Sequence, residues 1–222
     1  LSGTHDLNRR IEFIYKTLAQ FKSQGGWMRA LRALRAMTRS MDKPSPDTTN
    51  DLRAVQAFSR ALGVPPEEGG KILDQSISEL FPKLERHFYP IPGAVEFLDW
   101  AKDRFSLVLA TNPVWPEEIV RLRLKWAGVD PQIFRSMTHS RRMHACKPSI
   151  EYYEEILKQE NLQPSDCLLI GDDLAKDLPA VEAGISVFIL SNQPFRMLKY
   201  PNQKSLHSSW TGSFEELRHF LE

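Results

Sequence analysis

Hydrophobic and polar residues alternate differently in the two halves of the chain. In the N-terminal part, apolar side chains recur every three or four positions, which is the spacing of an α-helix. This periodicity predicts helices over residues 7–21, 27–41, 49–62 and 71–87. Thr49 or Asn50 can cap the third helix, and Pro82 interrupts the fourth. The first 88 residues are therefore predicted to form an all-helical domain.

From about residue 89, short apolar runs alternate with helical periodicity. Strands are predicted at 105–110, 134–137, 167–170 and 185–190, and helices at 94–102, 117–127, 150–159, 174–183 and 213–221. Gly184 is placed to end the fourth of these helices. Such alternation is typical of a parallel sheet with helices on both faces. We therefore predict a doubly wound α/β core over residues 89–222.

The segment from Cys167 to Asp177 carries the clearest chemical signal. Its apolar run ends at Gly171, where Asp172 and Asp173 follow, and Asp177 comes one helical turn later. Ligands of open α/β sheets bind at this carboxyl edge. Carboxylates held close together raise each other's pKa unless a cation lies between them. Because oxygen ligands favour a hard metal, Asp172, Asp173 and Asp177 are predicted to bind Mg²⁺.

An alternative for this segment is that Asp172 or Asp173 only caps the helix that begins at Leu174. A cap needs one aspartate, and three within seven residues exceed that need. A metal site is therefore favoured over simple capping.

Two upstream segments extend the pattern. The apolar run 106–110 ends in Thr111 and Asn112, and Lys147 stands just before the predicted helix 150–159. Alone, the first would indicate a turn and the second a solvated lysine. In this order, followed by the acidic cluster, they resemble the second, third and fourth motifs of the haloacid dehalogenase-like (HAD) hydrolases. The resemblance extends from about Tyr89 to Leu190.

The resemblance implies roles for these residues. Thr111 and Lys147 would be catalytic, and together with Asn112 they would hold a phosphoryl group. Asp172 would be the main Mg²⁺ ligand. Asp177 would hold a metal-bound water or orient Lys147, and Asp173 would do either or cap the helix. The helical domain over residues 1–88 would be a cap over the active site.

The sequence departs from the family in one respect. The family's first motif, an apolar strand followed by Asp-x-Asp-x-Thr, supplies the nucleophile, and no Asp-x-Asp occurs in these 222 residues. A parallel sheet without its central strand would leave backbone groups unpaired. We therefore expect that strand to precede Leu1 in the native protein. The alternative is a protein that has lost its nucleophile.

The function implied by the resemblance is a Mg²⁺-dependent phosphatase. It would act on a small phosphorylated metabolite through an aspartyl-phosphate. The alternative is a non-catalytic HAD-like protein that binds a phosphorylated ligand or a protein partner. Dehalogenation on the same fold needs no Mg²⁺, so the acidic cluster weighs against it.

Composition narrows the partners. With 29 basic and 28 acidic residues, the net charge does not call for nucleic acid or a membrane. Arg29, Arg32, Arg35 and Arg39 have helical spacing. For them a solvated face is favoured over a surface that binds anions. Only two cysteines occur, which fits a reducing compartment and a cytoplasmic location. Oligomeric state is not predicted.

Overall fold

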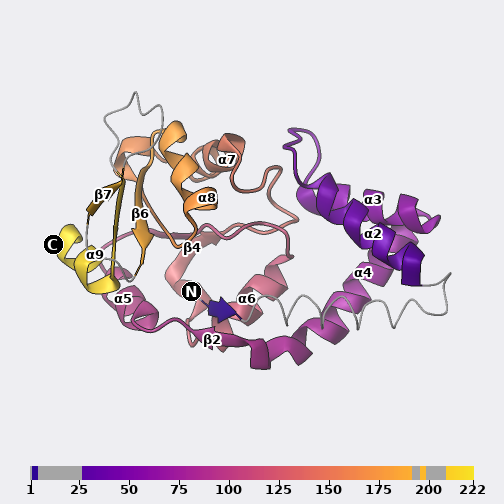
Figure 1. Cartoon of the computed structure of the whole chain (residues 1–222), viewed down its shortest axis with the longest axis horizontal. Helices are drawn as coiled ribbons and strands as arrows, with labels where there is room; N and C mark the ends of the chain where they lie inside the picture. Colours follow the sequence, from indigo (N-terminus) through magenta and orange to yellow (C-terminus); the bar gives the residue numbers. More distant parts are fainter. Residues whose placement is uncertain (1, 5–26, 192–195, 199–208) are drawn as a thin grey trace. The chain divides into compact units, whose positions relative to one another are not determined.

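The computed structural model describes residues 2–4, 27–191, 196–198 and 209–222 (Figure 1). The helix predicted over residues 7–21 lies outside the described residues. By its contacts the chain divides into two compact units, residues 1–143 and 144–222. The boundary near residue 88 between a cap and a core stays a prediction.

The first unit begins with a helical segment, which comprises α2 (Trp27–Ser40), α3 (Asn50–Leu62), α4 (Pro66–Leu80) and the 3-10 helix η2 (Phe81–His87). Its core is formed by Ala30, Ala33, Leu34, Phe58, Leu62 and Leu73. The Thr49 side chain caps α3, and Gly63 ends it with a φ of +73°, which favours glycine. α4 changes to 3-10 geometry beside Pro82, as predicted. It starts earlier than predicted because Pro66 suits the first helical position.

The rest of the first unit is mixed α/β. It contains β1 (Ser2–Thr4), β2 (Phe88–Pro90), α5 (Ala94–Ala101), β3 (Leu107–Leu109), α6 (Glu117–Trp126), η3 (Pro131–Ile133) and β4 (Phe134–Met137). β3 and β4 pair in parallel, whereas β1 and β2 are antiparallel. A buried cluster packs α5 and α6 against the parallel pair, with Leu98, Val120, Leu124, Ala127, Val129 and Met137 at its centre. This buried cluster therefore fixes β3 and β4, and with them the loops that follow their carboxyl ends.

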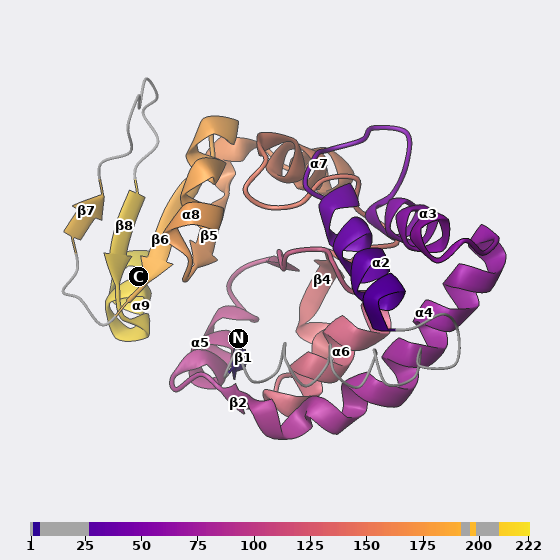
Figure 2. The ribbon, with the colours of Figure 1, turned by 45° about the vertical axis from the view of Figure 1, so that its right-hand side comes forward.

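The second unit contains α7 (Ile150–Glu160), η4 (Pro164–Asp166), β5 (Leu168–Gly171), α8 (Leu174–Asp177), η5 (Leu178–Ala183), β6 (Ser186–Leu190), β7 (Arg196–Leu198), β8 (Ser209–Gly212) and α9 (Phe214–Leu221). The strand order is β5-β6-β8-β7, in which only β7 is antiparallel. Figure 2 shows α8 following directly from the end of β5. Val187 and Phe188 in β6 are fully buried, as a central parallel strand requires.

The predicted α/β fold class is confirmed, because parallel strands alternate with helices in both units. The single helix predicted over residues 174–183 is wrong in detail. It consists of α8 and then the 3-10 helix η5, and the change occurs beside Pro179, which lacks a backbone N–H. Strands β1, β2, β7 and β8 were not predicted, and β1 lies within the region that was predicted to be all-helical. Among the described residues, no helix has the length and apolarity that a membrane span requires.

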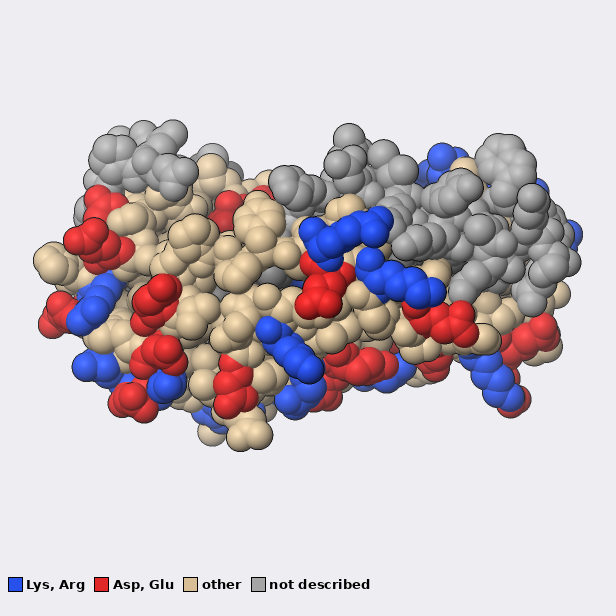
Figure 3. Space-filling view, turned by 90° about the horizontal axis from the view of Figure 1, so that it is seen from below, with Lys and Arg blue, Asp and Glu red and all other residues tan. Residues whose placement is uncertain are grey.

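Charged side chains are distributed over the described surface. On the face drawn in Figure 3, basic and acidic residues are interspersed. Arg29, Arg32, Arg35 and Arg39 are all exposed on α2, as a solvated helix face requires. The absence of a nucleic-acid partner stays a prediction.

Candidate active site

A buried ion pair lies at the carboxyl end of β5. The Lys147 Nζ atom is 2.6 Å from Oδ1 of Asp177, and the two side chains are only 9% and 4% exposed. The other carboxylate oxygen, Oδ2, accepts hydrogen bonds from the backbone N–H groups of Asp172 and Asp173, at 3.1 and 3.0 Å. Asp177 therefore fixes both the lysine and the backbone that leaves the strand.

These contacts explain how the buried charges are tolerated. Removing two charges from water is costly unless they pair closely and their remaining hydrogen-bonding groups are satisfied. Asp177 has the ammonium group and two N–H donors as partners. Lys147 also lies 5.7 Å from the centre of the Tyr152 ring, within the range of a cation–π contact. The lysine is thus held at one position at the edge of the sheet.

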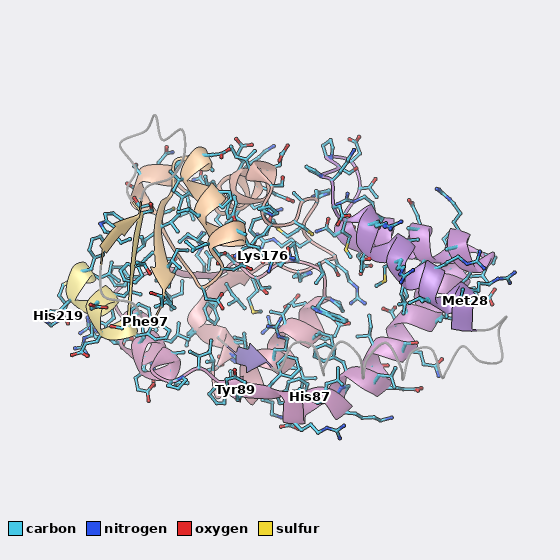
Figure 4. The ribbon with its side chains drawn as sticks, in the orientation of Figure 1. Met28, His87, Tyr89, Phe97, Lys176 and His219 are labelled. Atoms are coloured by element: carbon cyan, nitrogen blue, oxygen red, sulfur yellow. The ribbon has the colours of Figure 1, made fainter. Side chains whose placement is uncertain are left out.

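Asp173 has a different role from Asp177. Its Oδ1 atom accepts hydrogen bonds from the N–H groups of Ala175 and Lys176, which makes it the N-cap of α8. Its Oδ2 atom lies 2.5 Å from the Nζ atom of Lys176, a residue labelled in Figure 4. This hydrogen bond from Lys176 lowers the pKa of the Asp173 carboxyl. Of the alternatives open for Asp173, the geometry favours the helix cap.

Asp172 is the exposed aspartate of the three. Its backbone is held by Asp177, while its carboxylate has no hydrogen bond or ion pair among the residues that the structure describes. In the described ranges no group of three or more His, Cys, Asp or Glu side chains is arranged to hold a metal. Mg²⁺ commonly takes one or two carboxylates and completes its coordination with water and phosphate oxygens. Asp172 therefore fits Mg²⁺ as a single protein ligand.

The structure revises one step of the sequence argument. Three neighbouring carboxylates were expected to require a metal for charge balance. Instead, Lys147 balances Asp177 and Lys176 balances Asp173. Direct binding of Mg²⁺ by Asp173 or Asp177 stays a prediction, and both carboxylates already have other partners.

Gly171 is the point where β5 approaches Asp177 most closely. A methyl group at Gly171 would lie 2.2 Å from Oδ2 of Asp177, far inside contact distance. Gly171→Ala is therefore expected to destabilise the protein by about 1–3 kcal/mol, as overpacking does, and to disturb the ion pair. Urea unfolding measures the change.

Gly70→Ala is the matched control for this substitution. The nearest atom to a methyl group at Gly70 is 3.6 Å away, and the residue is in a helix, where alanine is preferred. This control is expected to be neutral or stabilising. Equal stability of Gly171→Ala and the wild type would contradict the tight packing of Gly171 on Asp177.

Thr111 follows β3 in the first unit and is half-buried. Its carbonyl oxygen accepts a hydrogen bond of 2.6 Å from the hydroxyl of Thr138, the residue directly after β4. The backbone N–H of Thr138 donates to the carbonyl of Leu109. Two residues after Thr111, the carbonyl of Pro113 accepts a hydrogen bond of 3.2 Å from Asn50. The loop that carries Thr111 and Asn112 is thus anchored at both ends.

Sequence reasoning missed both anchors. Thr138 and Asn50 are buried polar residues, and their partners are 27 and 63 positions away in the chain. The available signals were the place of Thr138 at a strand end and that of Asn50 at a helix start. Neither signal identifies a partner.

The predicted site residues thus fall into two groups. The structure brings Lys147, Asp172, Asp173 and Asp177 together within the second unit. Thr111 and Asn112 belong to the first unit. That both groups face one ligand stays a prediction.

Comparison with known proteins gives the family. The model of the haloacid dehalogenase-like hydrolases matches residues 64–184, which is more than half of the chain. The matched range includes the segments around Thr111, Lys147 and Asp172. No curated protein matches the sequence significantly.

Several solved structures share the fold. A predicted phosphoglycolate phosphatase from Haemophilus somnus is 17% identical with a TM-score of 0.52, over 97% of this chain and 92% of that one. The putative HAD-hydrolase YfnB from Bacillus subtilis, bound to magnesium, is 19% identical with a TM-score of 0.52, over 99% and 93%. A dehalogenase with an intermediate complex is 15% identical with a TM-score of 0.52, over 94% and 90%. At these identities the likeness supports the fold alone.

Proposed function

The chain belongs to the haloacid dehalogenase-like hydrolases, and from this premise we propose that it is a Mg²⁺-dependent phosphatase of small phosphorylated metabolites. One observation carries the proposal. A buried lysine–aspartate pair, Lys147–Asp177, lies beside the exposed carboxylate of Asp172 at the end of a parallel strand. A fixed positive charge next to an open oxygen ligand suits a phosphoryl group that carries a metal ion.

Lys147 would neutralise charge on the phosphoryl oxygens. A lysine ammonium acts as a compact point charge, and its effect is large where water is excluded. Asp177 keeps the ammonium at the strand end, so little reorganisation is needed when substrate binds. The ammonium group of Lys147 would therefore favour binding of a dianionic ester over a neutral one.

Asp172 would hold Mg²⁺ together with water and phosphate oxygens. When bound, the metal would offset the repulsion between carboxylates and the phosphate dianion. Asp177 would orient Asp172, because the carboxylate of Asp177 accepts a hydrogen bond from the backbone N–H of Asp172. The solved relative bound to magnesium is consistent with this assignment.

Thr111 and Asn112 would complete the phosphoryl site with a hydroxyl group and a backbone N–H. The anchors from Thr138 and Asn50 hold their loop before substrate arrives. Pre-set donors of this kind stabilise charge that develops in the transition state. The nucleophile of the family's mechanism is not among these residues, so the proposal concerns the groups that hold phosphate and metal.

The proposed function is tested by measuring phosphate release from a panel of small phosphomonoesters, with 2-chloropropionate as a haloacid control. The intact protein should hydrolyse at least one ester with Mg²⁺ and should release no chloride. Chloride release without phosphate release would replace the phosphatase with a dehalogenase. Tight phosphate binding without any turnover would favour the non-catalytic alternative.

Thr111→Ala is expected to lower kcat for a phosphomonoester by about 10²-fold, because a transition-state donor is lost. Thr111→Ser keeps the hydroxyl group and should stay within about threefold of the wild type. Steady-state kinetics of the intact protein measure both. Equal rates for the alanine and serine variants would show that the hydroxyl group has no part in the reaction.

A further inference from the structure

Asn50 is a fully buried polar residue at the start of α3, with 0% of its surface exposed. Buried amides are costly unless they are hydrogen-bonded, so the partners of Asn50 indicate what it holds in place. Its side-chain Nδ2 donates to the carbonyl of Pro113, and its backbone N–H donates to the carbonyl of Met143 at 2.8 Å. Its Oδ1 atom accepts a hydrogen bond from Arg53, one turn along α3.

The neighbouring residue, Asp51, makes the second attachment of α3. Its backbone N–H donates to the carbonyl of Ser140 at 3.0 Å, and its carboxylate accepts from the Ser140 hydroxyl at 3.1 Å. Arg141 extends this attachment, since its guanidinium group pairs with Asp74 on α4 and Glu118 on α6. Asp51 thus docks the helical segment on Ser140 and Arg141.

The two attachments reach the chain after Thr111 at different points. Asn50 contacts Pro113 directly, whereas Ser140, the partner of Asp51, donates its backbone N–H to the carbonyl of Trp115 at 2.8 Å. Pro113 is two residues beyond Thr111 and is itself fully buried. The carbonyl of Thr111 is held by Thr138, and that of Pro113 by Asn50. Between them, the N–H of Val114 donates to the carbonyl of Asn112 and tightens the turn. The loop therefore has one anchor from the strand side and one from the helical segment.

We propose that Asn50 is a positioning residue that sets the Thr111–Pro113 loop for phosphoryl binding. This inference rests on the proposed function. The amide of Asn50 fixes the far end of the turn, so that the Thr111 hydroxyl and the Asn112 N–H keep the spacing that a phosphoryl group needs. A displacement of about 1 Å at such donors can lower a rate by about 10²-fold. The helical segment thereby acts on this loop through the hydrogen bond from Asn50 to Pro113.

The test uses Asn50→Asp in the intact protein. The carboxylate keeps the shape of the side chain and its contact with Arg53, but it presents an acceptor to the Pro113 carbonyl in place of a donor. We expect inorganic phosphate to bind about tenfold more weakly by calorimetry. We also expect kcat for a phosphomonoester to fall by about tenfold or more, with a smaller change in KM.

Asn50→Ala is the second variant, and it removes the donor without adding a buried charge. Asp51→Asn is the matched control, because it weakens the attachment of α3 to Ser140 and leaves the Pro113 contact intact. The control should bind phosphate within about twofold of the wild type. Thermal unfolding gives the midpoint temperature of each variant, and phosphate binding is measured well below that temperature, where every variant is folded.

The outcomes separate the inference from the proposed function. Weaker phosphate binding in both Asn50 variants, with Asp51→Asn unchanged, would support the inference. If Thr111→Ala weakens phosphate binding and the Asn50 variants do not, the inference is overturned and the proposed function stands. If Asp51→Asn weakens phosphate binding as much as the Asn50 variants do, Asn50 only docks the helical segment and the inference is also overturned. If Thr111→Ala and the Asn50 variants all bind phosphate as the wild type does, both proposals fail.

Discussion

Lys147→Ala is expected to lower kcat of the intact protein by about 10²-fold or more. The ammonium group of Lys147 is buried at the end of β5 and is fixed by Asp177, so no other described lysine holds this place. Loss of a preorganised charge in a water-poor site removes stabilisation that is made mainly in the transition state. Steady-state hydrolysis of a phosphomonoester at saturating Mg²⁺ measures the effect.

Lys176→Ala is the matched control for this prediction. Lys176 is an exposed lysine of the same unit that also pairs with an aspartate, Asp173, but at the surface. An exposed pair contributes at most about 1 kcal/mol to stability, and its loss should leave kcat within about twofold. Circular dichroism would check that Lys147→Ala is folded before the rates are compared. Similar rates for both variants would contradict the role of Lys147.

Asp172→Asn is expected to weaken Mg²⁺ binding by about 10²-fold and to abolish phosphatase activity. Asp172 is the aspartate at this strand end whose carboxylate has no protein partner among the described residues. The amide keeps the shape of the side chain but removes the negative charge that binds a hard cation. Even residues that only support metal ligands alter affinity by about 10–100-fold, so a direct ligand should have at least that effect.

Asp166→Asn is the control for Mg²⁺ binding, since Asp166 is an exposed aspartate before β5. Its affinity should equal that of the wild type. Asp173→Asn decides the alternative left open for Asp173, because asparagine caps a helix as well as aspartate does. Unchanged affinity in Asp173→Asn would establish the cap, whereas a loss equal to that of Asp172→Asn would make Asp173 a ligand. Equal affinity of Asp172→Asn and the wild type would remove Asp172 from the metal site.

The site could be predicted from the sequence where its chemistry is local. The apolar run before Gly171 and the aspartates after it predicted both the strand and the polar groups at its end. That Asp177 orients Lys147 was one of two roles that the family resemblance left open, and the structure shows this contact. The strand and its aspartates are neighbours in the sequence, and the contact between Lys147 and Asp177 follows from the order of the family's motifs.

Other features depend on contacts that the sequence does not show. The hydrogen bond of Asn50 spans 63 positions, and nothing around Asn50 indicates that Pro113 is its partner. The contact of Lys176 with Asp173 was missed because a lysine in the first turn of a helix usually extends into solvent without a fixed partner. β8 was missed because its four residues, Ser209–Gly212, include two small polar residues and a glycine that hide the apolar pattern.

Phosphate release by the intact wild-type protein, measured as Mg²⁺ is removed and restored, tests directly whether the protein is a metal-dependent phosphatase. A phosphomonoester that is hydrolysed with Mg²⁺ should become stable when the metal is chelated, and activity should return when Mg²⁺ is added in excess. This result would support a phosphatase that uses metal at the end of β5. Hydrolysis that continues at the same rate without metal would contradict a role for Mg²⁺ in the reaction.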